Sequence, residues 1–405
     1  MFSELHLAVA LDGAGWHPAA WREPTARPRE LFSPRYWADL VATAERGLLD
    51  LVTIDDSLAL QTHRSWAPDE RVDEVRGRLD ALLVTSFVAP LTTRIGLVPT
   101  VTTTHTEPFH VAKALATLDH TSLGRAGWQV RVSARPAEAA HFGRRDLPQY
   151  DPSDLGDGMP PALSDLFAEA GDVIEVVRRL WDSWEDDAEI RDVATRRFVD
   201  RAKVHHIDFA GRFFSVRGPS ITPRPPQGQP VVGLLAHRRE PYDLAARGAD
   251  LVFVTPTPAH GAEAVLADVA RAATGAGRTG EPLHVYADVV VALDGPGEPG
   301  AARLRRLDDA AGEPYTSDTT VFAGSAPELA DLLASWHGLG YRGARLRPAT
   351  LPDDLDRIVE DLVPELRRRG LFRTAYPEDS SLRGLLGLPI TVPNRYAAGV
   401  GEATA

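Results

Sequence analysis

The chain has 405 residues, of which 43% are hydrophobic and 25% are charged, and its formal net charge is −13. The two shares are ordinary for a globular protein, and the length allows a large core. The acidic balance argues against nucleic acid or an anionic membrane as the main partner, because both bind a basic face. The absence of cysteine excludes disulfides, thiolate catalysis and cysteine metal ligands.

No apolar run in the sequence reaches the roughly 18 residues of a membrane span. The first residues, MFSELHLAVALDGAG, lack the basic start and the A-x-A cleavage site of a signal peptide. Their apolar part is typical of a first strand. We therefore expect a cytoplasmic protein without a membrane partner.

Short apolar runs alternate with amphipathic segments along the chain, which predicts strands and helices in turn. The predicted strands cover residues 5–11, 51–54, 94–99, 126–133, 231–235, 251–254, 285–293 and 344–347. The predicted helices cover residues 34–48, 108–120, 163–184, 242–247, 259–273, 327–339 and 353–369.

Strands that are nearly continuous in valine, leucine and isoleucine suit a parallel sheet that is buried on both faces. Eight of them with interleaved helices predict an α/β fold, a (β/α)8 TIM barrel. We expect a single domain over residues 1–405, with a C-terminal tail over about 371–405. An open doubly wound sheet is the alternative, which the lack of a G-x-G-x-x-G motif after the first strand disfavours.

Polar stretches rich in glycine and proline interrupt this pattern in four places. They follow the second, fourth and seventh predicted strands and precede the fifth, at residues 57–79, 135–161, 295–320 and 186–230. Insertions after barrel strands tend to form the mouth of an active site. Decorative surface loops are the alternative.

In a barrel, polar residues at the carboxyl ends of the strands are the first candidates for a site. The strand ends supply Asp12, Trp16, His17, Asp55, Asp56, Thr104, His105, Gln129, Arg131, Ser133, His237, Arg238 and Arg239. Several of these also have a structural explanation. The two consecutive aspartates are suited to capping a turn, and a lone histidine is equally compatible with a core or an exposed position.

The sequence contains no convincing motif for a metal or a nucleophile. His105 and His110 lack the i, i+4 spacing of a helical zinc site, and Pro108 interrupts them. There is neither a P-loop nor a G-x-S-x-G elbow. The residues alone thus predict a barrel with a polar mouth and leave its chemistry open.

Residues 117–136, TLDHTSLGRAGWQVRVSARP, combine a helix end, a tight turn and a strand that carries polar side chains. This segment resembles LDHLSGGRxGWNxVTS, a signature of the bacterial-luciferase-like flavin-dependent monooxygenases. The resemblance is to the branch with nitrilotriacetate monooxygenase, dibenzothiophene-sulfone monooxygenase and the pristinamycin synthase large subunit. Further similar segments, including AERGLLDLVTIDDS and VPELRRRGLFRTAYPEDSSLRGLLGLPITVPNR, follow in the same order over nearly the whole chain.

The resemblance implies a two-component monooxygenase. In such a system reduced FMN, supplied as a co-substrate by a separate NAD(P)H:flavin reductase, binds at the barrel mouth and reacts with O2. The resulting C4a-hydroperoxyflavin transfers one oxygen atom to a small organic substrate. The resemblance also implies a homodimer, or a heterodimer with a paralogue.

Carried over by position, Asp56 matches an acidic flavin contact, Thr104 a hydroxyl near the isoalloxazine ring, and Gln129 an asparagine on strand four. We expect His105 and Gln129 to be catalytic. The expected cofactor-binding residues are Asp56, Thr104, Gln129, Ser133, His237, Arg238 and Arg239. The expected substrate pocket consists of Trp16, His17 and Trp128, and we expect no metal.

The phosphate-binding loop departs from the family pattern. The family's QAGSSxxG after strand five corresponds here to LLAHRREP, residues 234–241. Either Arg238, Arg239 and His237 bind the phosphate by charge, or the flavin site has been lost. A reduced-FMN-dependent monooxygenase is therefore the expected function. The alternatives are a non-catalytic partner subunit with a degenerate flavin site and a related deazaflavin-dependent oxidoreductase.

Overall fold

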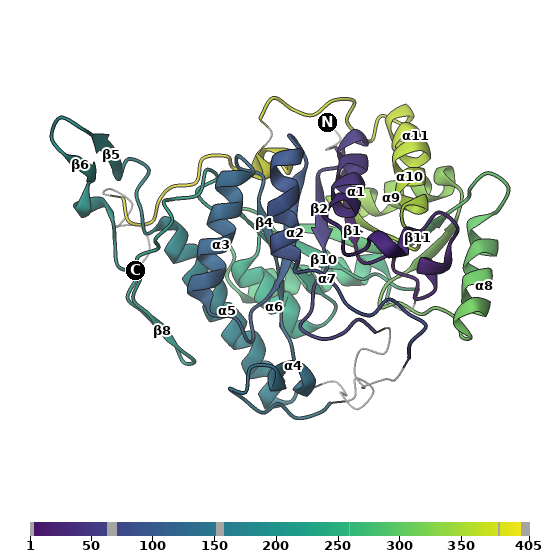
Figure 1. Cartoon of the computed structure of the whole chain (residues 1–405), viewed down its shortest axis with the longest axis horizontal. Helices are drawn as coiled ribbons and strands as arrows, with labels where there is room; N and C mark the ends of the chain where they lie inside the picture. The colour runs from purple at the N-terminus through teal and green to yellow at the C-terminus, as the bar shows by residue number, and fades with distance from the viewer. Residues whose placement is uncertain (1–3, 63–70, 151–157, 259, 380, 398–405) are drawn as a thin grey trace.

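The computed structural model describes residues 4–62, 71–150, 158–258, 260–379 and 381–397. Parts of two predicted insertions, the first residue of the helix predicted at 259–273 and the end of the predicted tail lie outside the described residues. The numbering of helices and strands follows Figure 1.

Eight parallel strands form a closed barrel with helices around it (Figure 1). In order around the barrel they are β1 (His6–Leu11), β2 (Leu51–Ile54), β3 (Gly96–Thr102), β4 (Gly127–Arg131), β9 (Val231–Ala236), β10 (Leu251–Val254), β11 (His284–Leu293) and β13 (Gly343–Pro348). The ring closes between β10 and β11, where Leu251 pairs with His284 and Val254 with Ala287. The predicted (β/α)8 fold is confirmed, and the open sheet is excluded.

The helices cover the outside of the barrel. They are α1 (Pro34–Arg46), α2 (Ala81–Val88), α3 (Pro108–Thr121), α4 (Pro136–Ala140), α5 (Pro161–Asp182), α6 (Arg239–Gly248), α7 (Ala262–Gly275), α8 (Gly300–Ala311), α9 (Ala326–Leu339), α10 (Asp353–Arg357), the π turn η6 (Ile358–Leu362), α11 (Val363–Arg368) and α12 (Leu382–Leu385). Short 3-10 helices are η1 (Ala20–Arg22), η2 (Pro28–Glu30), η3 (Ala89–Leu91) and η5 (Arg201–Lys203). Among the described residues no helix is long and apolar enough to cross a membrane.

Three of the elements that the sequence did not predict are informative. The sequence ALLVTSFV of α2 is apolar on almost every side and so gives little helical periodicity. The helix α8 lies in a segment that its glycines, prolines and charges mark as a loop, although it buries Arg303, Leu307 and Ala311 at four-residue spacing. An extra strand, β12 (Val321–Gly324), pairs in parallel with the second half of β11.

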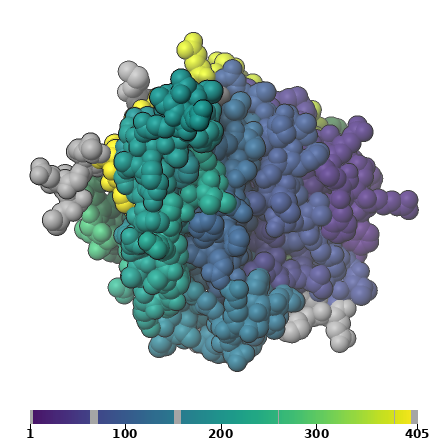
Figure 2. Space-filling model, turned by 60° about the vertical axis from the view of Figure 1, so that its left-hand side comes forward, coloured from purple at the N-terminus to yellow at the C-terminus, as the bar shows by residue number. Residues whose placement is uncertain are grey.

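The long insertion before β9 forms two small antiparallel hairpins. They are β5 (Glu189–Asp192) with β6 (Arg197–Val199) and β7 (Phe209–Ala210) with β8 (Ser215–Val216). Figure 1 shows them projecting beside α5, and Figure 2 shows the insertion as a teal surface next to the blue surface of the earlier helices. This insertion therefore extends the outer surface of the molecule beside the barrel.

Two buried charged side chains hold the turn that leads into β4. Arg125 is 3% exposed and donates hydrogen bonds to the carbonyl oxygens of Ala89, Thr92, Ile95 and Ser122 and to the hydroxyl of Thr92. Asp119 accepts hydrogen bonds from the backbone N–H groups of Ala126 and Gln227 and from Gln227 Nε2. The signature segment thus has a structural role beneath β4.

The amino-terminal end of the barrel is covered by the C-terminal segment, which Figure 1 shows in yellow at the end of the barrel opposite α4. Leu382 contacts the backbone of two strands at glycine positions. A Cβ atom on Gly96 would lie 2.4 Å from Leu382 Cδ1, and one on Gly127 would lie 3.0 Å from Leu382 Cδ2. Leu386 and Leu388 complete this buried cluster, so the segment closes the lower core.

Candidate active site

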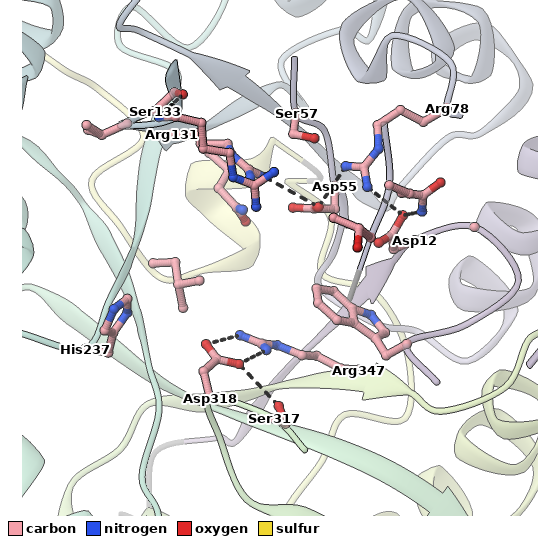
Figure 3. A pocket seen from close by; sticks show the side chains of 18 of the residues that line it. Asp12, Asp55, Ser57, Arg78, Arg131, Ser133, His237, Ser317, Asp318 and Arg347 are labelled. Carbon is pink, nitrogen blue, oxygen red and sulfur yellow. Dashed lines mark hydrogen bonds and ion pairs between the residues drawn. The ribbon is translucent and has the colours of Figure 1, made fainter. Parts of the chain in front are cut away.

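A cavity of about 710 Å³ opens at the carboxyl ends of the barrel strands. Its walls come from the residues after β1, β2, β4 and β9, from the end of β13 and from the loop before β12. Figure 3 shows polar side chains converging from these elements. A cavity of this volume at this face of a barrel is suited to a cofactor or a small substrate. No group of three or more described acidic or histidine side chains is placed to hold a metal ion.

Alternating charges line one side of the cavity (Figure 3). Arg78 Nη1 donates to Asp55 Oδ2 at 3.0 Å, and Arg131 Nη1 lies 3.6 Å from the same oxygen. Asp12 accepts a hydrogen bond from Gln61 Nε2 at 2.6 Å. Burial raises the pKa of Asp12 to about 6, whereas Arg131 and Arg78 overcome the effect of burial on Asp55 and lower its pKa. The site therefore holds one carboxyl group that exchanges a proton near neutral pH and one that stays ionised.

Arg347 of β13 lines the floor of the cavity, and Arg345 of β13 and Asp288 of β11 lie buried beneath it. Asp288 is fully buried and accepts hydrogen bonds from Arg345 Nε and from Arg347 Nε, both at 2.8 Å. Arg347 also donates to Asp318 Oδ1 at 2.6 Å, in the loop before β12, as Figure 3 shows. Arg345 Nη1 donates to the side-chain oxygen of Gln129. The floor thus links β4, β11 and β13 through charged hydrogen bonds.

Sequence reasoning by strand ends missed the arginines and the aspartate of the floor. The strand sequence GARLRP carries a signal for the arginines, because alternate residues of a strand point to the same side. Asp288 interrupts the otherwise apolar run HVYADVVVAL in the same way. A charged residue inside a strand that is buried on both faces needs an opposite charge nearby, and this requirement would have paired the two strands.

The start of α6 forms another part of the wall. His237 and Arg238 line the cavity, and α6 begins directly afterwards, where the side chain of its N-cap residue Arg238 makes no capping hydrogen bond. Burial lowers the pKa of His237. Arg239 is not part of the cavity lining and lies 3.7 Å from Asp243 of its own helix. The helix start and Arg238 together place positive charge at this end of the cavity.

Of the residues expected to have a catalytic, cofactor-binding or substrate-binding role, six line the cavity: Trp16, His17, Gln129, Ser133, His237 and Arg238. Their neighbours limit what some of them can do. Both ring nitrogens of His17 are engaged, one by the N–H of Ala19 and the other by Asp308 at 3.1 Å. Trp16 donates its indole N–H to the Ala10 carbonyl, and its ring faces the guanidinium of Arg347.

Four other predicted residues have contacts around the cavity rather than on its surface. Asp56 accepts from the N–H of Ala81 at 2.9 Å, so its neighbour Asp55 takes the position facing the cavity. Thr104 Oγ1 accepts from the N–H of Ser133. The ring of His105 stacks on that of Phe142 with centroids 4.9 Å apart, and Trp128 is fully buried in the barrel core. Their roles toward a flavin or a substrate stay predictions.

Comparisons with known proteins agree with this architecture. The chain is 32% identical to nitrilotriacetate monooxygenase component A of Aminobacter aminovorans, over 95% of this chain and 96% of that one. It is 29% identical to N-acetyl-S-(2-succino)cysteine monooxygenase of Bacillus subtilis, over 97% and 98% of the two chains. The crystal structure of long-chain alkane monooxygenase shares the fold, with a TM-score of 0.82, 23% identity and 96% of each chain covered.

The family assignment rests on the greater part of the chain. A family model described as luciferase-like monooxygenase matches residues 14–307. These residues include most strands of the barrel and four of the segments that form the cavity wall. The chain therefore belongs to the luciferase-like monooxygenase family of flavin-dependent enzymes.

Proposed function

We propose that the protein binds reduced FMN at the barrel mouth and uses it to insert one oxygen atom of O2 into a small organic substrate. A separate NAD(P)H:flavin reductase would supply the reduced FMN. The observation that carries this proposal is the cavity, which combines a positively charged end at the start of α6 with a floor that presents the amide of Gln129.

The residues at the start of α6 fit a phosphate group. Arg238 and His237 line the cavity beside the first turn of the helix, where Arg239 and Glu240 carry N–H groups that the Arg238 side chain does not cap. A helix start attracts anions, and an arginine strengthens this attraction by charge and by its paired N–H donors. In this protein charge would thus replace the small hydroxyl residues of the family loop.

The middle of the cavity fits a flat ring with polar edges. Leu234, Leu235 and Phe167 supply apolar wall, while Gln129 and Ser133 supply polar groups. Bound reduced FMN would supply the electrons that activate O2. The chain itself would orient the ring, keep water from the reacting atoms and, through Asp12, hold an exchangeable proton near neutral pH.

An anaerobic titration with reduced FMN, followed by mixing with oxygenated buffer, tests the proposal. We expect saturable binding and a reoxidation of the bound flavin that is slower than that of free reduced FMN. Incorporation of labelled oxygen from O2 into a candidate substrate then tests the oxygen transfer. Absence of binding, with reoxidation at the rate of the free flavin, would reject the proposed activity.

The altered loop at residues 234–241 favours a second candidate, a non-catalytic subunit that pairs with an active paralogue. In that case the purified protein would bind neither form of FMN and would form a stable complex with the paralogue. A deazaflavin-dependent oxidoreductase is the third candidate. It would bind the reduced deazaflavin in the same titration in preference to FMN.

Replacing Arg238 tests the phosphate assignment directly. We expect Arg238→Ala to weaken FMN binding by about 1.5–3 kcal/mol, the value of a hydrogen bond to a charged group. The matched control is Arg239→Ala, because Arg239 does not line the cavity and its side chain lies near Asp243. Fluorescence titration measures both. Equal dissociation constants for Arg238→Ala and the wild type would exclude Arg238 as the phosphate ligand.

We also propose a homodimer that forms through α2. Leu83, Phe87 and Leu91 follow one another at four-residue spacing and are 67%, 47% and 57% exposed. An apolar stripe of this kind on a protein surface marks an interaction site. We expect Phe87→Glu to shift the protein from dimer to monomer in light scattering, while Phe198→Glu on the distant hairpin leaves the mass unchanged. A monomeric wild-type protein would contradict this proposal.

A further inference from the structure

The amide of Gln129 is held in one orientation by Arg345. Arg345 Nη1 donates a hydrogen bond to the side-chain oxygen of Gln129. A guanidinium group has only donors, so the atom that faces it must be the oxygen of the amide. The other end, Nε2, has no hydrogen-bond partner within the described part of the chain, and Gln129 lines the cavity. The protein therefore presents an N–H donor, not a carbonyl oxygen, to whatever occupies the cavity.

Two buried arginines lie beneath this amide, and two carboxylates pair with them. Arg345 and Arg347 are each 2% exposed, and they share the buried carboxylate of Asp288. The second carboxylate, Asp318, lies at the mouth, where its side chain is 41% exposed. The guanidinium of Arg345 stacks on the ring of Phe253, with Cζ 4.0 Å from the ring centroid. Water screens the charge of Asp318, which pairs with Arg347, and Arg345 is the charged group that contacts the amide of Gln129, so the charge next to this amide is positive.

A hydrogen-bond donor that lies next to a positively charged group favours a ligand whose acceptor atom carries negative charge. The ring of fully reduced flavin loses its N1 proton near neutral pH and becomes an anion, whereas the oxidised ring is neutral, and charge near N1 is a means by which proteins tune flavins. We propose that Arg345 is a positioning residue that makes the cavity select reduced over oxidised FMN. It does so by holding Gln129 as a donor and by placing positive charge beneath it. This inference rests on the proposed function.

The ratio of two dissociation constants tests the proposal. Oxidised and reduced FMN share the same phosphate and ribityl chain. Contacts to these groups therefore cancel in the ratio of the two dissociation constants, which reports on contacts to the ring. We expect the wild-type protein to bind reduced FMN more tightly. Gln129→Glu and Arg345→Met should each lower this preference about tenfold, equivalent to about 1.4 kcal/mol. The first replaces the donor by a carboxylate, and the second removes the charge.

A matched control separates this effect from a general effect of charge. The side-chain oxygen of Gln229 also accepts from an arginine, Arg178 Nη1 at 3.1 Å, but Gln229 does not line the cavity. Gln229→Glu should therefore retain the wild-type ratio. Arg345→Met leaves Asp288 paired with Arg347, and Gln129→Glu carries the test if Arg345→Met does not fold.

The outcomes distinguish this inference from the proposed function. If the wild-type protein binds neither form of FMN, the proposed function fails and this inference fails with it. If the wild-type protein binds both forms equally, or if neither variant changes the ratio, FMN binding stands and only the role of Arg345 is overturned. A lowered ratio in both cavity variants, with the control unchanged, supports the inference.

Discussion

Replacing Asp288 by leucine is expected to lower the free energy of unfolding by about 3–5 kcal/mol, the range found when one partner of a buried ion pair is removed. Asp288 is fully buried and accepts hydrogen bonds from both Arg345 and Arg347. Without it, Arg345 would lose its ion pair with a buried carboxylate, and Arg347 would keep its ion pair with Asp318. Urea denaturation monitored by circular dichroism measures this loss.

The control for this prediction is an ion pair on the surface. Asp165 is 42% exposed on its side chain and binds Arg212 with two hydrogen bonds. Asp165→Leu should cost no more than about 1 kcal/mol, because water screens an exposed pair. If Asp288→Leu cost as little as this surface change, Asp288 could not be the charge that holds the floor together.

Replacing Arg125 by methionine should be comparably destabilising, by about 3–5 kcal/mol. The guanidinium makes five hydrogen bonds, and four of its acceptors are backbone carbonyl oxygens that the change would leave without this partner. Each buried polar group that loses its partner costs about 1–3 kcal/mol, although structural relaxation keeps the total below the sum. Thermal and urea unfolding of the variant measure the effect.

Lysine at the same position provides the informative comparison. It keeps the positive charge but lacks the planar set of five donors, so Arg125→Lys should recover only a small part of the lost stability. Full recovery by lysine would show that charge alone matters at this turn. Unchanged stability of Arg125→Met would show that the carbonyl groups find other partners, contrary to this prediction.

The sequence was most informative where one physical requirement dominated. Seven of the eight predicted barrel strands coincide closely with observed ones, because strands buried on both faces consist mainly of apolar residues. The third strand was placed too early: β3 runs to Thr102, since threonine is as well suited to a strand as to a loop. The helix α2 escaped detection because its exposed side is also apolar.

The site was predictable in position but only partly in its residues. The rule that polar strand ends form the site led to Asp12, Gln129 and His237, all of which line the cavity. It could not decide which of two consecutive aspartates faces inward, because that depends on the backbone at the end of β2. Arg345 was missed because it lies inside a strand, where its partner comes from another strand distant in sequence.

The closure of the barrel bottom by Leu382, Leu386 and Leu388 links the last helix of the described chain to strands near its beginning. Contacts between segments so far apart in sequence form slowly, because the intervening chain must first lose much of its freedom. During synthesis the strands leave the ribosome well before the leucines that cover them. The apolar underside of the barrel can therefore be covered only after nearly the whole chain has been made.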